Sequence, residues 1–184
     1  MENSNNNKND HNSYFIDYIF RLCKSDSGAA SKLKRAGSEN QMALSYGILV
    51  GAGIDIEKKY QLIPHSIVAE IIAKSDLESD TGKENFGKVL RLASELKKEK
   101  GQEINDTKMR RILNCDTLEE LQIVLRSMLN FIISRGFIDK LSLNDFLKDL
   151  LKFESEWAQN RIKKKWAIGF YSSNNDDEEN DSNG

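Results

Sequence analysis

The sequence has few of the side chains on which enzymes most often rely. It contains two histidines, two cysteines and one proline. His11 lies in a polar N-terminal stretch, and His65 directly follows Pro64 at a predicted helix start, where a capping or surface role is the ordinary one. No HExxH motif, no CxxC motif and no Walker-type phosphate-binding loop occurs. We therefore expect no enzymatic activity, no catalytic residue, no cofactor and no metal site.

Carboxylates that could hold a divalent cation are also few. Four of them lie near one another towards the C-terminus, at Asp145, Asp149, Glu154 and Glu156. Asp145 and Asp149 are four residues apart and share a helix face. Because lysines alternate with them, the pattern is typical of a solvated or ion-paired surface rather than of a divalent-metal nuclease.

Cysteine is scarce, and no apolar run is long. Cys23 and Cys115 lie far apart, each among apolar residues at helical spacing, which predicts buried free thiols in a reducing compartment. No stretch approaches the roughly 18 apolar residues of a membrane-spanning helix. The first residues are rich in asparagine, unlike a secretion signal. We expect a cytoplasmic protein that does not contact a membrane.

Alternating strand patterns are absent, whereas apolar residues recur at helical spacing. The sequence therefore predicts an all-α fold, an irregular bundle of about seven or more helices in one or two lobes. The expected helices cover about 14–23, 26–36, 39–50, 64–74, 86–101, 106–113, 116–136 and the residues after 142, with a loop over 75–85.

Local signals predict where these helices begin and end. Gly136 is suited to a left-handed stop, and Pro64 to a first helical residue. The expected N-terminal caps are Ser25 or Asp26, Asp106, Asp116 and Ser142. The pattern leaves open whether the last helix runs on to Tyr171 or breaks near Gln159.

Composition divides the chain into three parts. Residues 1–13 are polar and rich in asparagine, and residues 172–184 are acidic with a charge of −5, so we expect both to be disordered. Residues 14–171 form the expected helical domain. Its second half is the basic one, because residues 83–171 carry a charge of +5 against −1 in residues 14–82. Such an imbalance is typical of a protein with a polyanionic partner, although a solvated helix surface gives the same count.

Basic residues gather in three places and are joined by single residues between them. The candidate nucleic-acid-binding residues are Lys32, Lys34, Arg35, Lys88, Arg91, Lys108, Arg110, Arg111, Arg126, Arg161, Lys163, Lys164 and Lys165. Pairs three or four apart project together from a helix at a spacing that suits successive phosphates. We expect one surface to carry the six from Lys88 to Arg126, because their three helices follow one another through short links.

The C-terminal segment places large aromatic residues among cations. Trp157, Trp166 and Phe170 interleave with Arg161 and the run of lysines at 163–165. An aromatic residue in such a setting either anchors the helix in the core or stacks on a ligand. We expect Trp157 and Trp166 to be core anchors.

The order of short motifs resembles the CasB family, the small subunit of type I-E CRISPR effector complexes (Cascade). The matching segments are 33–36 (LKRA), 86–92 (FGKVLRL), 108–113 (KMRRIL), 118–121 (LEEL), 125–126 (LR), 149–150 (DL) and 166–171 (WAIGFY). The resemblance spans about 14–171. Lys108, Ile112 and Phe153 depart from the residues usual in that family, and Lys108 in place of arginine weakens a bidentate phosphate contact there.

The resemblance implies an all-α subunit without catalytic activity that binds nucleic acid without base specificity. Its implied partners are the Cascade backbone and large subunits, the crRNA and the target DNA, including the displaced non-target strand. A second copy is implied as well, in a head-to-tail dimer. The implied role is to hold the crRNA–target heteroduplex and the displaced strand. The alternative is a helical protein–protein adaptor with no nucleic-acid role, its basic faces merely solvated.

Overall fold

The computed structural model describes residues 4–96 and 105–172, with side chains from residue 11 onward. Within these ranges nine α-helices and two 3-10 helices form, together with one isolated β-bridge between Glu84 and Leu141. The α-helices are α1 (Ser4–Ser25), α2 (Ser27–Leu33), α3 (Tyr46–Gly51), α4 (Lys59–Lys74), α5 (Phe86–Glu95), α6 (Thr107–Leu113), α7 (Leu118–Ser134), α8 (Leu143–Lys152) and α9 (Glu156–Tyr171). The 3-10 helices are η1 (Met42–Ser45) and η2 (Ile138–Lys140). The expected all-α bundle is confirmed.

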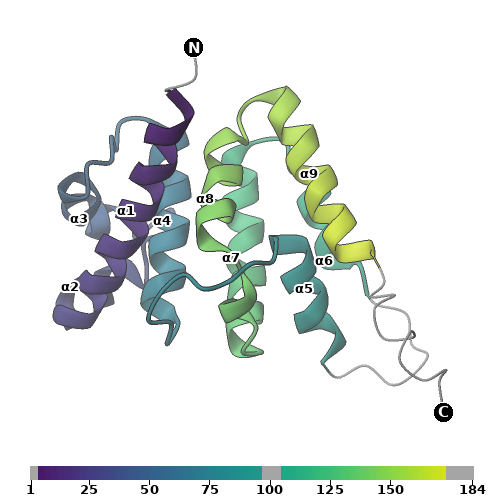
Figure 1. The fold of residues 1–184 in the computed structure, drawn as a ribbon, viewed down its shortest axis with the longest axis horizontal. Coiled ribbons are helices and arrows are strands. Elements are labelled where there is room, and N and C mark those ends of the chain that lie inside the picture. Colours follow the sequence, from purple (N-terminus) through teal and green to yellow (C-terminus); the bar gives the residue numbers. More distant parts are fainter. Residues whose placement is uncertain (1–3, 97–104, 173–184) are drawn as a thin grey trace.

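The helices are arranged in three neighbouring groups (Figure 1). At one end α1, α2 and α3 gather around α4, and at the other α5, α6 and α9 lie together, with α7 and α8 between them. α4 packs against α7 and α8, and α9 packs most extensively against α5. No helix in the described ranges is both long and apolar enough to span a membrane.

α4 is the central helix, and its position corrects the expectation for Pro64. The helix begins at Lys59, so Pro64 lies inside it rather than at its first position. Every residue from Leu62 to Ala73 is buried, as is typical of a helix surrounded by others. Pro64 cannot donate a hydrogen bond to the carbonyl of Tyr60. The burial of Leu62 and Ile63 ahead of the proline outweighs that loss, which a proline-based rule does not take into account.

His65 is a core residue, not the capping or surface residue that we expected. It is 3% exposed, and its ring meets Phe15 of α1 edge to face, with 4.6 Å between the ring centroids. Nδ1 lies 2.6 Å from the carbonyl oxygen of Gln61, so the neutral ring donates its proton there. Burial lowers the pKa of His65 from 6.5 to about 4.

Helix ends follow the predicted signals in most places. Ser142 caps α8 by accepting a hydrogen bond from the backbone of Asp145, and Asp26 caps α2. Gly136 adopts φ 76° after α7. The amides of Gly136 and Phe137 donate to the carbonyls of Ile133 and Ile132 in the last turn, as in a Schellman motif. The cap of α7 is Thr117 rather than Asp116, because the Thr117 hydroxyl accepts the Glu120 amide at 3.2 Å.

Two of the expected helices differ from the prediction in their bounds. α1 begins at Ser4, ahead of the start expected near Tyr14, so it extends into the stretch 1–13 that we expected to be disordered. Asn12 is buried, and Ser13 Oγ accepts a hydrogen bond from Asn144 of α8 at 3.2 Å, which gives this stretch a place in the packing. The helix expected over 39–50 is divided into η1 and α3. The expected end at Gly101 and the acidic tail after Ser172 lie outside the described residues.

The sequence left open whether the last helix runs on to Tyr171 or breaks near Gln159. In the structure the helix breaks ahead of Gln159. α8 ends at Lys152 and α9 begins at Glu156, with a turn over 153–155 between them. Phe153 in this turn is fully buried, so it anchors the chain where the direction changes. As a consequence, the apolar stripe of α8 does not continue into Trp157.

The backbones of α5 and α9 approach closely at Gly87. A Cβ atom at this position would lie 1.8 Å from the carbonyl oxygen of Trp166. The carbonyl belongs to the helix backbone and cannot rotate away, so Gly87 permits the packing of the two helices.

Gly87→Ala should therefore destabilise the protein by about 3 kcal/mol, because one helix must shift away from the other. Gly47→Ala is the matched control: Gly47 lies in α3, and a Cβ there would meet nothing within 4 Å. In the control the alanine should stabilise by about 0.5–1 kcal/mol through helix propensity. Urea unfolding of both variants measures the difference, and equal stabilities would contradict the close approach of α5 and α9.

The buried His65 makes stability depend on pH. Its folded pKa lies below the unfolded value, so between about pH 6.5 and pH 4 the unfolded chain binds a proton that the folded chain does not. Stability falls as pH falls through this window, and by pH 5 the loss from His65 is about 2 kcal/mol. His65→Gln, which cannot titrate, should lose about that much less than the wild type between pH 7 and pH 5. Urea unfolding at the two pH values tests this, and identical losses would show that His65 is accessible to protons when folded.

Candidate nucleic-acid interface

The first basic cluster lies on α2 and the turn that follows it. Lys32, Lys34 and Arg35 are all exposed, and none forms an ion pair with another described residue. Figure 1 shows α2 at the end of the molecule opposite α9. This cluster therefore cannot join the basic residues of α6 and α9 in one contact surface on a single chain.

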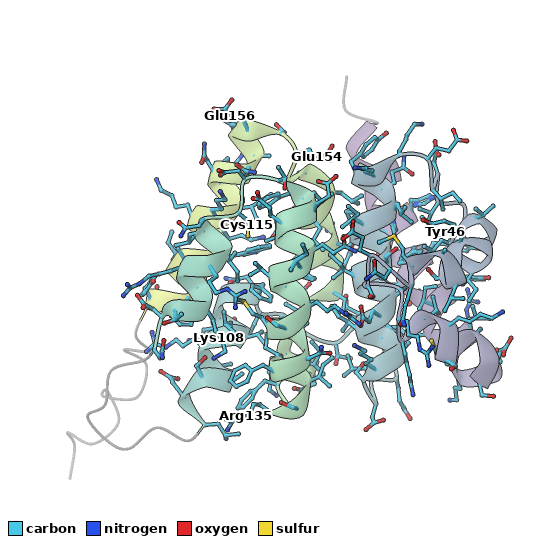
Figure 2. All side chains as sticks on the ribbon, turned by 180° about the vertical axis from the view of Figure 1, so that it is seen from behind. Tyr46, Lys108, Cys115, Arg135, Glu154 and Glu156 are labelled. Atoms are coloured by element: carbon cyan, nitrogen blue, oxygen red, sulfur yellow. The ribbon has the colours of Figure 1, made fainter. Side chains whose placement is uncertain are left out.

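The second cluster projects from α6, beside α7. Lys108 Nζ lies 4.5 Å from the centre of the Phe131 ring of α7, and the guanidinium of Arg135 lies 5.2 Å from the same ring. Two cations thus share one aromatic side chain, which fixes their positions without neutralising either. Figure 2 labels both residues, on the face where α6 and α7 are nearest the viewer.

The other two cations of α6 differ in whether they form an ion pair. Arg110 forms an ion pair with Asp106 at 2.8 Å and lowers the pKa of that carboxyl, while Tyr171 of α9 donates to the same aspartate at 3.1 Å. Arg111 is exposed and has no ion pair among the residues that the structure describes. We call Lys108, Arg110, Arg111 and Arg135 the α6 ridge.

Arg91 serves the fold instead of a binding surface. Its guanidinium donates to Glu95 at 2.9 Å, to the carbonyl of Phe170 at 3.3 Å and to the carbonyl of Ser172. The side chain is 13% exposed. Arg91 thus binds the carbonyls at the end of α9, the part of a helix where unpaired acceptors and a cation stabilise each other.

Arg126 also lies apart from the α6 ridge. Its Nε is 3.5 Å from Glu70 of α4, a buried carboxylate that Lys74 also contacts. Phe131, which receives Lys108, is five residues further along α7 and therefore points about 140° away. Lys88 is half-buried on α5. Of the six residues from Lys88 to Arg126 for which we expected one surface, Arg91 and Arg126 thus form ion pairs with Glu95 and Glu70.

The cations of α9 divide between its two sides. Lys163 binds Asp116 at 3.3 Å on the side of α6 and is 13% exposed, whereas Lys165 binds Asp149 of α8 at 2.7 Å. Lys164 is exposed between these sides. Arg161 stacks on Trp157, 4.6 Å from the ring centre. Residues adjacent in the sequence thus serve different contacts, as the 100° step of a helix requires.

The two tryptophans have opposite environments. Trp166 is fully buried, as we expected, and its Nε1 donates to Asp149 at 2.8 Å. Trp157 is 70% exposed, which corrects the expectation that it anchors the core. The sequence signal that could have revealed this was the position of Trp157 directly after a helix start, one turn before Arg161.

The acidic and sulfur-containing residues are engaged in packing and ion pairs. Asp145 binds Lys148 at 3.2 Å, and Asp149 accepts from Trp166 and Lys165. Burial raises the pKa of both Cys23 and Cys115, which keeps these thiols protonated and weakly reactive at neutral pH. Among the described residues no group of three or more His, Cys, Asp or Glu is placed to hold a metal ion.

The motifs found in the sequence now have structural roles in one helical bundle. A comparison with protein families adds a match over residues 29–171 to the family described as CRISPR-associated protein Cse2. The chain belongs to the Cse2 family. Cse2 proteins are the small subunit of the type I-E CRISPR complex Cascade, a structural subunit and not a known enzyme family. Comparisons with curated proteins and with solved structures gave no match.

The family match covers all seven motifs from which the resemblance was recognised, although it begins at residue 29 and not near 14. It includes Gly87 and Trp166, whose contact joins α5 to α9. In this Cse2 chain the closing WAIGFY segment is therefore first of all a packing element.

The different roles of Arg91 and Arg111 can be separated by stability. Arg91→Ala should lower the free energy of unfolding by about 2 kcal/mol, because it leaves carbonyls at the end of α9 without their charged donor. Arg111→Ala should change it by less than about 0.5 kcal/mol, since an exposed side chain without partners is lost. Urea unfolding of the two single variants measures this. Equal effects would show that the contacts of Arg91 contribute nothing to the fold.

Proposed function

We propose that this Cse2 chain binds nucleic-acid backbones without sequence specificity and thereby holds the crRNA–target heteroduplex and the displaced non-target strand within Cascade. The observation that carries the proposal is the α6 ridge, where the exposed Arg110 and Arg111 and the half-buried Lys108 and Arg135 project from α6 and from the end of α7, with one carboxylate, Asp106, among them. Such a row neutralises phosphates and releases counterions, with no dependence on base identity.

The exchange of a DNA duplex for an RNA–DNA heteroduplex is nearly balanced in free energy. Modest contacts to the backbone can therefore shift it, and restraint of the displaced strand slows re-annealing. This is a task for a protein without catalytic groups, performed by binding alone.

The partners that follow are the backbone and large subunits of Cascade, the crRNA, the target DNA and a second copy of the chain in a head-to-tail arrangement. A surface for protein contacts is available at the end opposite the α6 ridge. Leu44 and Val50 of η1 and α3 are 50% and 53% exposed, and Figure 1 shows α3 far from α9. The adaptor role considered from the sequence is therefore compatible with nucleic-acid binding, since the two need not share a surface.

Lys108→Ala/Arg111→Ala should weaken binding of a labelled random-sequence single strand about equally for all sequences. The slope of log K against log salt concentration should become less steep by about 0.7 for each lost phosphate contact, or about 1.4 for both. Fluorescence anisotropy at several salt concentrations measures the slope, and circular dichroism checks that the helices are retained.

Lys58→Ala/Lys140→Ala is the matched control. It removes the same charge at exposed positions where each lysine already pairs with a neighbouring aspartate, Asp55 or Asp139. The control should keep the slope of the wild type. An unchanged slope in the α6 variant would exclude the ridge and favour the clusters at 32–35 and 161–165. Absence of binding by the wild type at low salt would leave the adaptor role alone.

A further inference from the structure

An open groove of about 380 Å³ lies between α8 and the first half of α9. Its lining includes Asp149, Lys152, Trp157, Arg161, Ile162 and Lys165. Trp157 directly follows Glu156, which Figure 2 labels near Glu154 at the turn between α8 and α9. The groove lies on the side of α9 that carries Lys165, away from the side where Lys163 faces Asp116. This Trp157 groove is therefore distinct from the α6 ridge.

One wall of the groove is an aromatic ring that is exposed to solvent. Arg161, one turn further along α9, stacks on Trp157 with 4.6 Å between its guanidinium carbon and the ring centre. The guanidinium restrains the indole from one side, and the residue remains 70% exposed. An indole fixed in this way presents a flat surface without the conformational entropy cost of ordering it on binding.

The charges around the ring favour an anionic ligand. Lys152 and Arg161 have no ion pair within the described part of the chain, whereas the single carboxylate of the lining, Asp149, is already engaged by Trp166 and Lys165. The groove thus combines an exposed aromatic face with two cations that pair with no carboxylate of its lining. A purely apolar partner would leave these cations without a counter-charge, and a phosphate alone would leave the indole face uncovered.

We propose that the Trp157 groove is a stacking site for one base of a single-stranded nucleic acid, with Arg161 and Lys152 binding the flanking phosphates. The site rests on the proposed function and adds to it a contact with the base that is short-ranged and weakly sensitive to salt. Every base has a π face, so stacking keeps the binding independent of sequence. DNA and RNA strands share this chemistry, and the groove is open to either.

The chain itself supplies the probe for a test. It contains two tryptophans, of which Trp166 is fully buried and Trp157 is 70% exposed. A base that stacks on Trp157 should quench its emission, while that of Trp166 stays constant as an internal reference. The full chain is titrated with a short oligothymidylate, an oligouridylate of the same length, and an abasic deoxyribose-phosphate strand. Quenching by the two base-bearing strands but not by the abasic strand is expected, and the stronger of the two identifies the source.

Trp157→Ala should weaken the binding of the two base-bearing strands about tenfold and leave the binding of the abasic strand unchanged. The affinity of Trp157→Phe for the base-bearing strands should fall between those of the alanine variant and the wild type. Ile168→Ala is the matched control, because Ile168 is 59% exposed and lies about three turns along the same side of α9. It should bind all three strands as the wild type does.

Two results would overturn the proposal, and they can be told apart. If the wild type binds all three strands equally without quenching, and Trp157→Ala changes nothing, the base site is excluded while the backbone function stands. Trp157 would then be a contact for a protein partner, a role in which exposed tryptophan and arginine often dominate. If the wild type binds none of the strands, the proposed function and the stacking site are both excluded.

Discussion

The arrangement of the C-terminal half depends on the burial of one side chain, Trp166. The indole packs against Phe86 of α5 and Phe146 of α8, with ring centroids 5.1 Å and 5.8 Å away, and its single polar atom donates to Asp149. Three helices meet on this ring, and α5 is far from α8 and α9 in the sequence. Because a buried N–H without a partner is costly, the Asp149 contact also fixes the rotation of α9 about its axis.

That rotation decides which cations reach solvent. With Trp166 and Phe170 turned inward, Lys163 falls on the side of Asp116 and Arg161 on the side of the groove. A run that looks like one basic patch in the sequence is therefore divided between the groove, the solvent and two intramolecular ion pairs. The same argument applies to Arg91, which the close packing at Gly87 brings near the end of α9, where its donors meet backbone carbonyls. Charge in the sequence locates candidate contacts, but packing decides which of them remain available.

The sequence predicted the helices well because the signals are local. Ser142 and Gly136 act through hydrogen bonds or φ angles within a few residues, and apolar spacing marks the buried face of each helix. The misassigned residues depend on distant partners. Pro64 and His65 are buried because five other helices surround α4, which no local rule reveals. Trp157 was assigned to the core because its type is apolar, yet the turn at 153–155 changes the direction of the chain ahead of it.

The charge of the whole chain argues that the proposed nucleic-acid binding would depend on local contacts. The net charge is −2, so no strong field draws a polyanion from a distance, and at physiological salt charges more than about 8 Å apart are largely screened. A strand would be held only where unpaired cations touch it. Contacts of that kind are individually weak and are lost as salt rises, whereas stacking on an indole persists. Weak phosphate contacts together with one stacked base would restrain a strand that other subunits deliver. Such contacts would be too weak to bind free nucleic acid elsewhere. Such a combination of contacts requires an aromatic ring that is open to solvent and a cation without a carboxylate partner. Trp157 is exposed, and Arg161 has no carboxylate partner within the described residues.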